Sequence, residues 1–154
     1  AGTTNNVIPQ SAELDITLRS LSEDTRERLA SGVCGLIEQI AVAHGLQGEA
    51  KLKRGYPPTI NHAAGSGLVA AAAKALLGEE GYRLMPEPFM AAEDFSYLLQ
   101  RYNGAFAFLG VGPPGTEGTA APCHSNHMLI DEDAMAVGVA MHAAIVLTSL
   151  DGSA

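Results

Sequence analysis

The chain has only 2 cysteines and no tryptophan among its 154 residues. Two thiols are too few for the disulfide framework of small secreted proteins. Cys34 falls in a helical pattern, where a thiol usually packs as a small apolar side chain, and Cys123 lies in a loop. Neither an H-E-x-x-H segment nor a C-x-x-C pair occurs. A disulfide scaffold is therefore excluded, and no complete zinc motif is present in the sequence.

Positive charge is scarce as well. Lys and Arg number 9 against 17 Asp and Glu, which gives a formal net charge of −8 at pH 7. The densest basic stretch is residues 51–54, so the chain offers no basic surface for a phosphate backbone. No apolar run approaches the roughly 20 residues of a membrane span, and no signal-peptide pattern occurs. We therefore predict a cytoplasmic protein with neither a nucleic-acid nor a membrane partner.

The composition that remains is typical of a globular chain, with 47% apolar and 17% charged residues. The chain opens without an initiating Met and enters at once what looks like the middle of a hairpin. We therefore expect a piece of a longer protein.

The first part of the chain predicts the order strand, strand, helix, strand, in which the opening residues are the first arm of a hairpin. Apolar and polar residues alternate over residues 12–19, as in a half-buried strand. Ser22 is a typical helix N-cap, and the helical pattern that follows ends at His44 and Gly45. A short strand is expected over residues 49–54, before Tyr56-Pro57-Pro58 interrupts regular structure.

The second part of the chain alternates helices and strands. Asn61 is a candidate cap for an alanine-rich helix that ends at Gly78, and Glu93-Asp94 is a candidate start for a helix through Leu99. An apolar run of strand length covers residues 105–111.

A loop rich in Gly and Pro follows over residues 110–122, and Asp131 to Asp133 begin a last helix that reaches Asp151. This alternation of strands and helices indicates the α/β class.

Cys123, His124 and His127 crowd the end of that loop. Two histidines three residues apart can bind a metal, although the spacing is not the i, i+4 pair of a helical zinc site. Ligands often follow a buried strand, which favours His124. The alternatives are a loop-packing thiol with surface histidines, or a small structural zinc site built from all three residues.

Charged residues elsewhere are also ambiguous. Arg19 ends the polar face of the first strand, where its guanidinium could bind a substrate carboxylate or pair with Asp15 or Glu13. Glu93 and Asp94 could form an acid/base pair, or could simply favour the dipole of the helix that they begin.

Three segments taken together resemble one family, the metal-dependent aminoacylases and hippurate hydrolases among the zinc peptidases. They read NVIPQSAELDITLRS, AAEDFSYLL, and GAFAFLGVGPPG followed by CHSNHMLIDEDAMAVGVA. A fourth segment of this chain, GYPPTINH, is similar to the junction between the two domains of that family. The resemblance implies an incomplete ferredoxin-like lid and dimerisation domain over residues 1–57. It places the C-terminal part of an α/β catalytic domain in residues 58–154.

The resemblance also implies roles for single residues. His124 matches a metal ligand, and Asn5, Asn6 and Arg19 match residues that contact the substrate carboxylate or the developing oxyanion. Glu93 and Asp94 match a Glu-Asp-Phe turn that supports the site without acting as its base. The resemblance carries no catalytic residue over to this chain, because the family's base and other ligands precede the lid.

The resemblance therefore implies a fragment of an enzyme that hydrolyses N-acyl, hippurate-like amino acids with two zinc or manganese ions, for which this chain supplies at most one ligand. We expect the isolated chain to be inactive and to self-associate, as a homodimer or otherwise. The alternative is a standalone α/β binding module in which Arg19 binds an acidic ligand. The acyl group, the amino acid and the choice of metal stay open.

Overall fold

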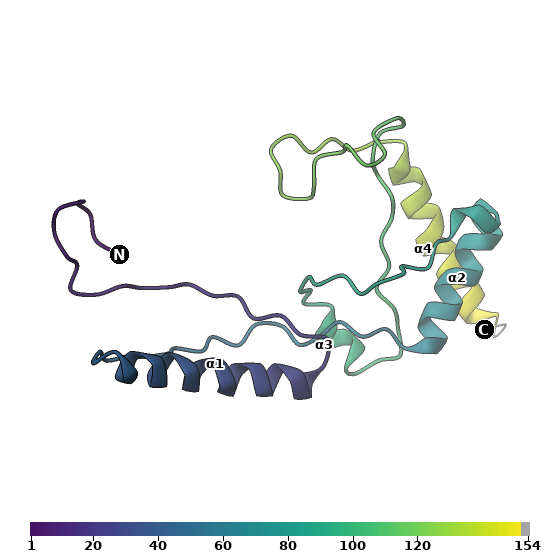
Figure 1. Cartoon of the computed structure of the whole chain (residues 1–154). Helices are drawn as coiled ribbons and strands as arrows, with labels where there is room; N and C mark the ends of the chain where they lie inside the picture. The colour runs from purple at the N-terminus through teal and green to yellow at the C-terminus, as the bar shows by residue number, and fades with distance from the viewer. Residues whose placement is uncertain (152–154) are drawn as a thin grey trace. The chain divides into compact units, whose positions relative to one another are not determined.

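The computed structural model describes residues 1–151, and the chain divides into two compact units. The first unit comprises Ala1–Pro58 with Phe89–Ala91, and the second comprises Thr59–Pro88 and the chain from Ala92 onward. Each unit has its own helices (Figure 1). Among residues 1–151, no helix is both long enough and apolar enough to cross a bilayer.

Helix α1, Glu23–Ala43, is the main element of the first unit. Ser22 caps it, since the Ser22 hydroxyl accepts a hydrogen bond from the Thr25 amide at 3.2 Å. At the other end Gly45 has a φ of +70°, and the Leu46 amide donates to the Ala41 carbonyl at 2.8 Å. This left-handed termination satisfies carbonyls that the last turn leaves unpaired. Both predicted ends of this helix are confirmed.

Two extended segments of the first unit run along α1 without forming strands (Figure 1). The strands predicted over residues 12–19 and 49–54 are wrong for this structure, which assigns no strand anywhere in residues 1–151. Leu14 and Ile16 are 78% and 57% exposed. A strand requires a neighbour for its backbone hydrogen bonds, whereas alternation in the sequence reports only which side chains share a face.

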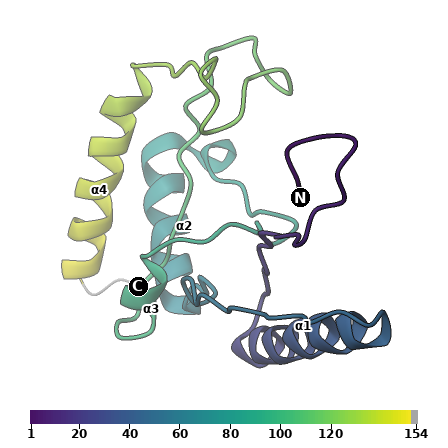
Figure 2. The same cartoon turned by 90° about the vertical axis from the view of Figure 1, so that its left-hand side faces the viewer.

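The second unit is built on α2, Ala63–Leu77, and α4, Ala134–Leu150, which pack against each other (Figure 2). Two short helices complete it, the 3₁₀ helix η1, Glu79–Gly81, and α3, Ser96–Leu99. Its buried side chains are small ones on α2, Ala72 and Ala73, together with Leu99 and Ser96 from α3. The predicted end of α2 at Gly78 is confirmed by a φ of +81° there.

The apolar run, together with Gly104 just before it, covers residues 104–111 and passes close to both long helices. A Cβ atom on Gly65 of α2 would lie 2.4 Å from the carbonyl carbon of Gly104, so the two backbones touch. A Cβ atom on Gly138 of α4 would lie 3.2 Å from Leu109 Cδ2. The run is extended but is not a strand, which corrects the strand predicted over residues 105–111 for the reason given above.

Candidate functional site

The residues predicted to bind metal or substrate, and those predicted to support the site, are divided between the two units. Asn5, Asn6 and Arg19 belong to the first unit, and Glu93, Asp94 and His124 belong to the second. All are exposed except Glu93, which is half-buried. Asn5 and Asn6 form part of a turn, while Arg19 lies in an extended segment. The roles of these six residues stay predictions.

His124 lies in a loop whose two ends are joined. This His124 loop, residues 112–130, leaves the apolar run at Val111 and returns at Asp131, whose amide donates to the Val111 carbonyl at 2.8 Å. In both views the loop lies at the end of α4 where that helix begins (Figures 1 and 2). Asp131 Oδ1 also accepts from the Asp133 amide at 3.1 Å, just before α4. The loop is therefore fixed where it meets the packed part of the unit.

The backbone of His124 is strained. Its φ of +71° makes it the one non-glycine residue with a positive φ among residues 1–151. The Ser125 amide donates to the Pro122 carbonyl at 3.1 Å and closes a tight turn around His124. A left-handed residue other than glycine costs on the order of 1–3 kcal/mol, and such residues cluster at active sites and ligand clamps. The strain therefore favours a functional role for this histidine.

The described residues do not by themselves form a metal site. Within residues 1–151, no group of three or more His, Cys, Asp or Glu side chains lies close enough to hold an ion. Cys123 and His127 are both exposed and do not converge with His124, so the three-residue zinc site considered above is wrong for this structure. The exposed imidazole of His124 fits one ligand of a site whose other ligands come from elsewhere.

The Glu93–Asp94 turn leads into α3, which begins three residues later than predicted, at Ser96. The fully buried Ser96 donates its hydroxyl to the Glu93 carbonyl at 2.6 Å, and the Tyr97 amide donates to the Asp94 carbonyl at 3.0 Å. The next ring, Phe95, packs on Phe106 with their centroids 5.8 Å apart. Backbone carbonyls therefore form the turn, which leaves both carboxylates available for other contacts.

Arg19 and the arginines near α1 have different surroundings. Within residues 1–151, Arg19 makes no ion pair, with Asp15 or Glu13 or with any other acid. Its guanidinium is exposed and is thus available to a ligand.

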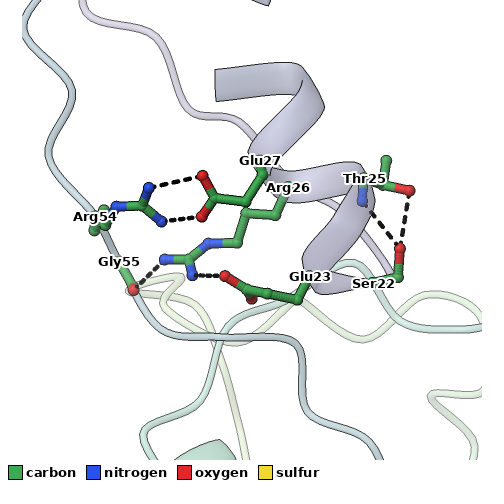
Figure 3. A network of polar contacts seen from close by, with 7 residues as sticks. All are labelled: Ser22, Glu23, Thr25, Arg26, Glu27, Arg54 and Gly55. Atoms are coloured by element: carbon green, nitrogen blue, oxygen red, sulfur yellow. Dashed lines mark hydrogen bonds and ion pairs between the residues drawn. The ribbon is translucent and has the colours of Figure 1, made fainter. Parts of the chain in front are cut away.

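Arg54, by contrast, forms a two-pronged ion pair with Glu27 of α1 (Figure 3). The second prong, from Nη2 of Arg54 to Oε2 of Glu27, measures 2.8 Å. These hydrogen bonds lower the pKa of the Glu27 carboxyl. Arg26 forms an ion pair with Glu23 at 2.8 Å and donates a hydrogen bond to the Gly55 carbonyl at 2.7 Å. The network attaches the segment before the unit boundary to the first turns of α1.

Asn61 does not cap α2, which corrects the helix cap predicted at this residue. The residue at the N-cap is His62, which makes no capping hydrogen bond with its side chain. Asn61 instead donates from Nδ2 to the Phe106 carbonyl at 2.9 Å and accepts from the Phe106 amide at 2.8 Å. An Asn can donate and accept at once, and that was the available signal. A partner 45 residues away could not be read from the sequence.

Comparison with known proteins gives the class to which these features belong, the metal-dependent amidohydrolases. The profile described as "Peptidase family M20/M25/M40" matches residues 9–148. The chain therefore belongs to that family, whose catalytic domain is of the α/β class.

Curated relatives agree with this assignment. Thermostable carboxypeptidase 1 of Saccharolobus solfataricus is 31% identical over 148 residues, which cover 96% of this chain and 36% of the relative. N-acetyldiaminopimelate deacetylase of Streptococcus pneumoniae (strain P1031) is 34% identical over 146 residues, covering 91% of this chain and 35% of the relative. The chain thus spans about a third of the length of the curated relatives it matches.

Proposed function

We propose that this chain is the C-terminal part of a metal-dependent amidohydrolase that removes the acyl group from an N-acyl amino acid. The observation that carries the proposal is His124, an exposed histidine held in a strained left-handed turn inside the region that matches the family. Such strain persists only where the surrounding structure maintains it, and here the Val111–Asp131 hydrogen bond joins the ends of the loop.

His124 is proposed to be one ligand of a divalent metal ion, zinc or manganese. When bound, the metal supplies Lewis-acid activation of the water that attacks the amide. The remaining ligands and the general base are proposed to lie outside this chain, because residues 1–151 hold no further ligand cluster. The isolated chain is therefore proposed to be inactive.

Arg19 is proposed to bind the carboxylate of the substrate, with Asn5 and Asn6 as further hydrogen-bond donors. A planar guanidinium can donate two parallel hydrogen bonds to a carboxylate, and that of Arg19 makes no ion pair within residues 1–151 that would have to break first. An N-acyl amino acid carries such a carboxylate beside its amide. The side-chain amides of Asn5 and Asn6 are also proposed to donate hydrogen bonds to the oxyanion that develops during hydrolysis.

The names of the relatives support this type of substrate. One describes removal of an acetyl group from N-acetyldiaminopimelate, and the other describes a carboxypeptidase. Both names are consistent with cleavage of an amide near a carboxylate. We propose more specifically that the substrate is hippurate-like, and the activity assay described below tests this with N-benzoylglycine.

The domain assignment is also proposed from the resemblance. Residues 1–57 would form part of a ferredoxin-like lid and dimerisation domain, and residues 58–154 would form part of the catalytic α/β domain. The division between the two compact units after Pro58 supports this boundary. Extended segments with unpaired backbones favour pairing with another chain, so we propose that the isolated chain self-associates. A clean monomer by size-exclusion chromatography with light scattering would contradict that part of the proposal.

The main test measures amino-acid release from N-benzoylglycine and from several N-acetyl amino acids, with zinc or manganese added. The chain alone is compared with a longer polypeptide that includes the upstream part of the same protein. We expect release only from the longer polypeptide, and we expect His124→Ala to abolish it there. His44→Ala is the matched control, because His44 ends α1 through its backbone. Robust release by the chain alone would overturn the proposal.

A further inference from the structure

Asn61 and His62 together hold a backbone segment that lies far away in the sequence. Besides the two hydrogen bonds between Asn61 and Phe106, the His62 amide donates to the Gly104 carbonyl at 3.0 Å, and the Gly104 amide approaches His62 Nδ1 at 3.4 Å. Both polar groups of Gly104 and both polar groups of Phe106 are thus directed at two adjacent residues. The apolar run has no other such backbone partner between residues 104 and 106.

The Asn61 carboxamide takes the place of a neighbouring strand. In a paired strand, one residue accepts and donates a hydrogen bond through the backbone of the residue opposite. The carboxamide makes the same two contacts with Phe106, at 2.8 and 2.9 Å, from a side chain. The arrangement satisfies the polar groups of Phe106 although the structure assigns no strand to this run.

Phe106 links this contact to the proposed active site. Its ring packs on Phe95 at 5.8 Å and on Phe108 at 5.3 Å, and Phe95 directly follows the Glu93–Asp94 turn. Farther along the same run, Val111 holds the end of the His124 loop through Asp131. A shift of Phe106 would therefore move the packing surface of the acidic turn.

We propose that Asn61 is a positioning residue, whose carboxamide fixes the backbone of Phe106 and, through the Phe106 and Phe95 rings, the Glu93–Asp94 turn. The importance of that turn for catalysis rests on the function proposed above. The positioning itself does not, because it can be measured without any activity. Nothing in this inference requires Asn61 to touch a substrate or a metal ion.

The chemistry of the contact suggests a variant that removes one of the two hydrogen bonds. The group at position 61 must donate one hydrogen bond and accept another. In the Asn61→Asp variant, an ionised carboxylate can accept from the Phe106 amide but would face the Phe106 carbonyl without a proton to donate. A protonated carboxyl has almost the same shape as the amide and can make both contacts. The contact with Phe106 should therefore be weakened at neutral pH and restored as the pH falls and the new carboxyl is protonated. That carboxyl should have a pKa at or above the ordinary value of about 4.

The experiment measures hydrogen exchange at single amides of the chain by NMR, at a series of pH values from 7 down to 3.5. Rates are corrected for intrinsic exchange and compared with the unsubstituted chain at the same pH. At pH 7 we expect Asn61→Asp to speed exchange of the Phe106 amide about fivefold to tenfold, the effect of one net hydrogen bond. The carboxylate repels the Phe106 carbonyl oxygen, so the whole contact opens more readily although the amide can still donate. We expect smaller increases at the Ser96 and Tyr97 amides, which close the acidic turn.

Two further variants make the result decisive. Asn61→Ala should show the same defect at every pH, with no restoration in acid. Asn103→Asp places the same charge on an exposed residue beside the run, and we expect no defect. If Phe106 exchange is unchanged in Asn61→Asp, or if Phe106 changes while Ser96 and Tyr97 do not, the positioning role is wrong. Failure of the longer polypeptide to release amino acids would overturn the proposed function and leave these exchange results standing.

Discussion

Replacing Gly65 by alanine tests the packing of α2 on the apolar run. An added Cβ would lie 2.4 Å from the carbonyl carbon and 2.5 Å from the carbonyl oxygen of Gly104, distances at which something must move. Both groups that collide belong to backbones, so no flexible side chain can turn away. Two residues along the same helix, Gly67 has nothing within 4 Å of the position of a Cβ atom, which makes Gly67→Ala the matched control.

The two substitutions are expected to have opposite signs. Alanine favours a helix over glycine by up to about 1 kcal/mol, and Gly67→Ala should gain most of that. Gly65→Ala gains the same but adds an overpacking cost, typically 1–3 kcal/mol and here near the upper end because the contact is between backbones. The net loss is then about 2 kcal/mol.

The assay is urea unfolding followed by the circular dichroism of the helices. With a slope of about 2 kcal/mol per molar urea, Gly67→Ala should raise the midpoint by about 0.5 M and Gly65→Ala should lower it by about 1 M. If Gly65→Ala raised the midpoint as much as Gly67→Ala does, the close approach of α2 to Gly104 would be refuted. The inferred position of the Phe106 backbone would then lose its main support.

Other parts of the structure give further predictions. Arg54 lowers the pKa of the Glu27 carboxyl. The ion pair should therefore contribute to stability at pH values above the ordinary carboxyl pKa of 4.5, and that contribution should be lost as the pH falls through the lowered pKa. Exchange of the α1 amides should therefore differ between Glu27→Gln and the unsubstituted chain at pH 7 and converge towards pH 3. A difference that is constant with pH would contradict this. Ser22→Ala removes the N-cap of α1 and should cost about 1 kcal/mol, measured as a lower urea midpoint; no change would show that the cap is dispensable. In the longer polypeptide, Arg19→Lys should raise KM about tenfold or more, because lysine cannot make the proposed two-pronged contact with the substrate carboxylate. Arg28→Lys is the control and should leave KM unchanged. Equal KM values for the Arg19→Lys variant and the unsubstituted polypeptide would exclude Arg19 from carboxylate binding.

The sequence was sufficient to predict the features whose causes are local. Ser22 begins α1 through a contact with Thr25, three residues away, and Gly45 ends it through its own backbone conformation. The termination of α2 at Gly78 is likewise a property of that residue. These signals act within one helical turn, so the chain immediately around them specifies the outcome.

Features that depend on distant partners were predicted less well. The pattern over residues 12–19 correctly marks an extended segment, but a strand also needs a partner that the structure does not provide within residues 1–151. Asn61 has the composition of a helix cap, yet its carboxamide is engaged by Phe106. The left-handed backbone of His124 was missed for another reason: its turn from Pro122 to Ser125 is local, but a positive φ is typical of glycine and a histidine does not signal it.

Helix α4 has an apolar surface that the described residues cover only in part. The helix has no Asp, Glu, Lys or Arg between Ala134 and Leu150, and such all-round apolar character is typical of helices that are buried on every side. α2 covers only part of it, since Val139 and Leu150 remain 73% and 77% exposed. Residues 135, 139, 146 and 150 fall on one stripe at helical spacing, with His142 among them. A second packing layer over this stripe would account for its composition, and the upstream part of the proposed longer polypeptide is one candidate for that layer.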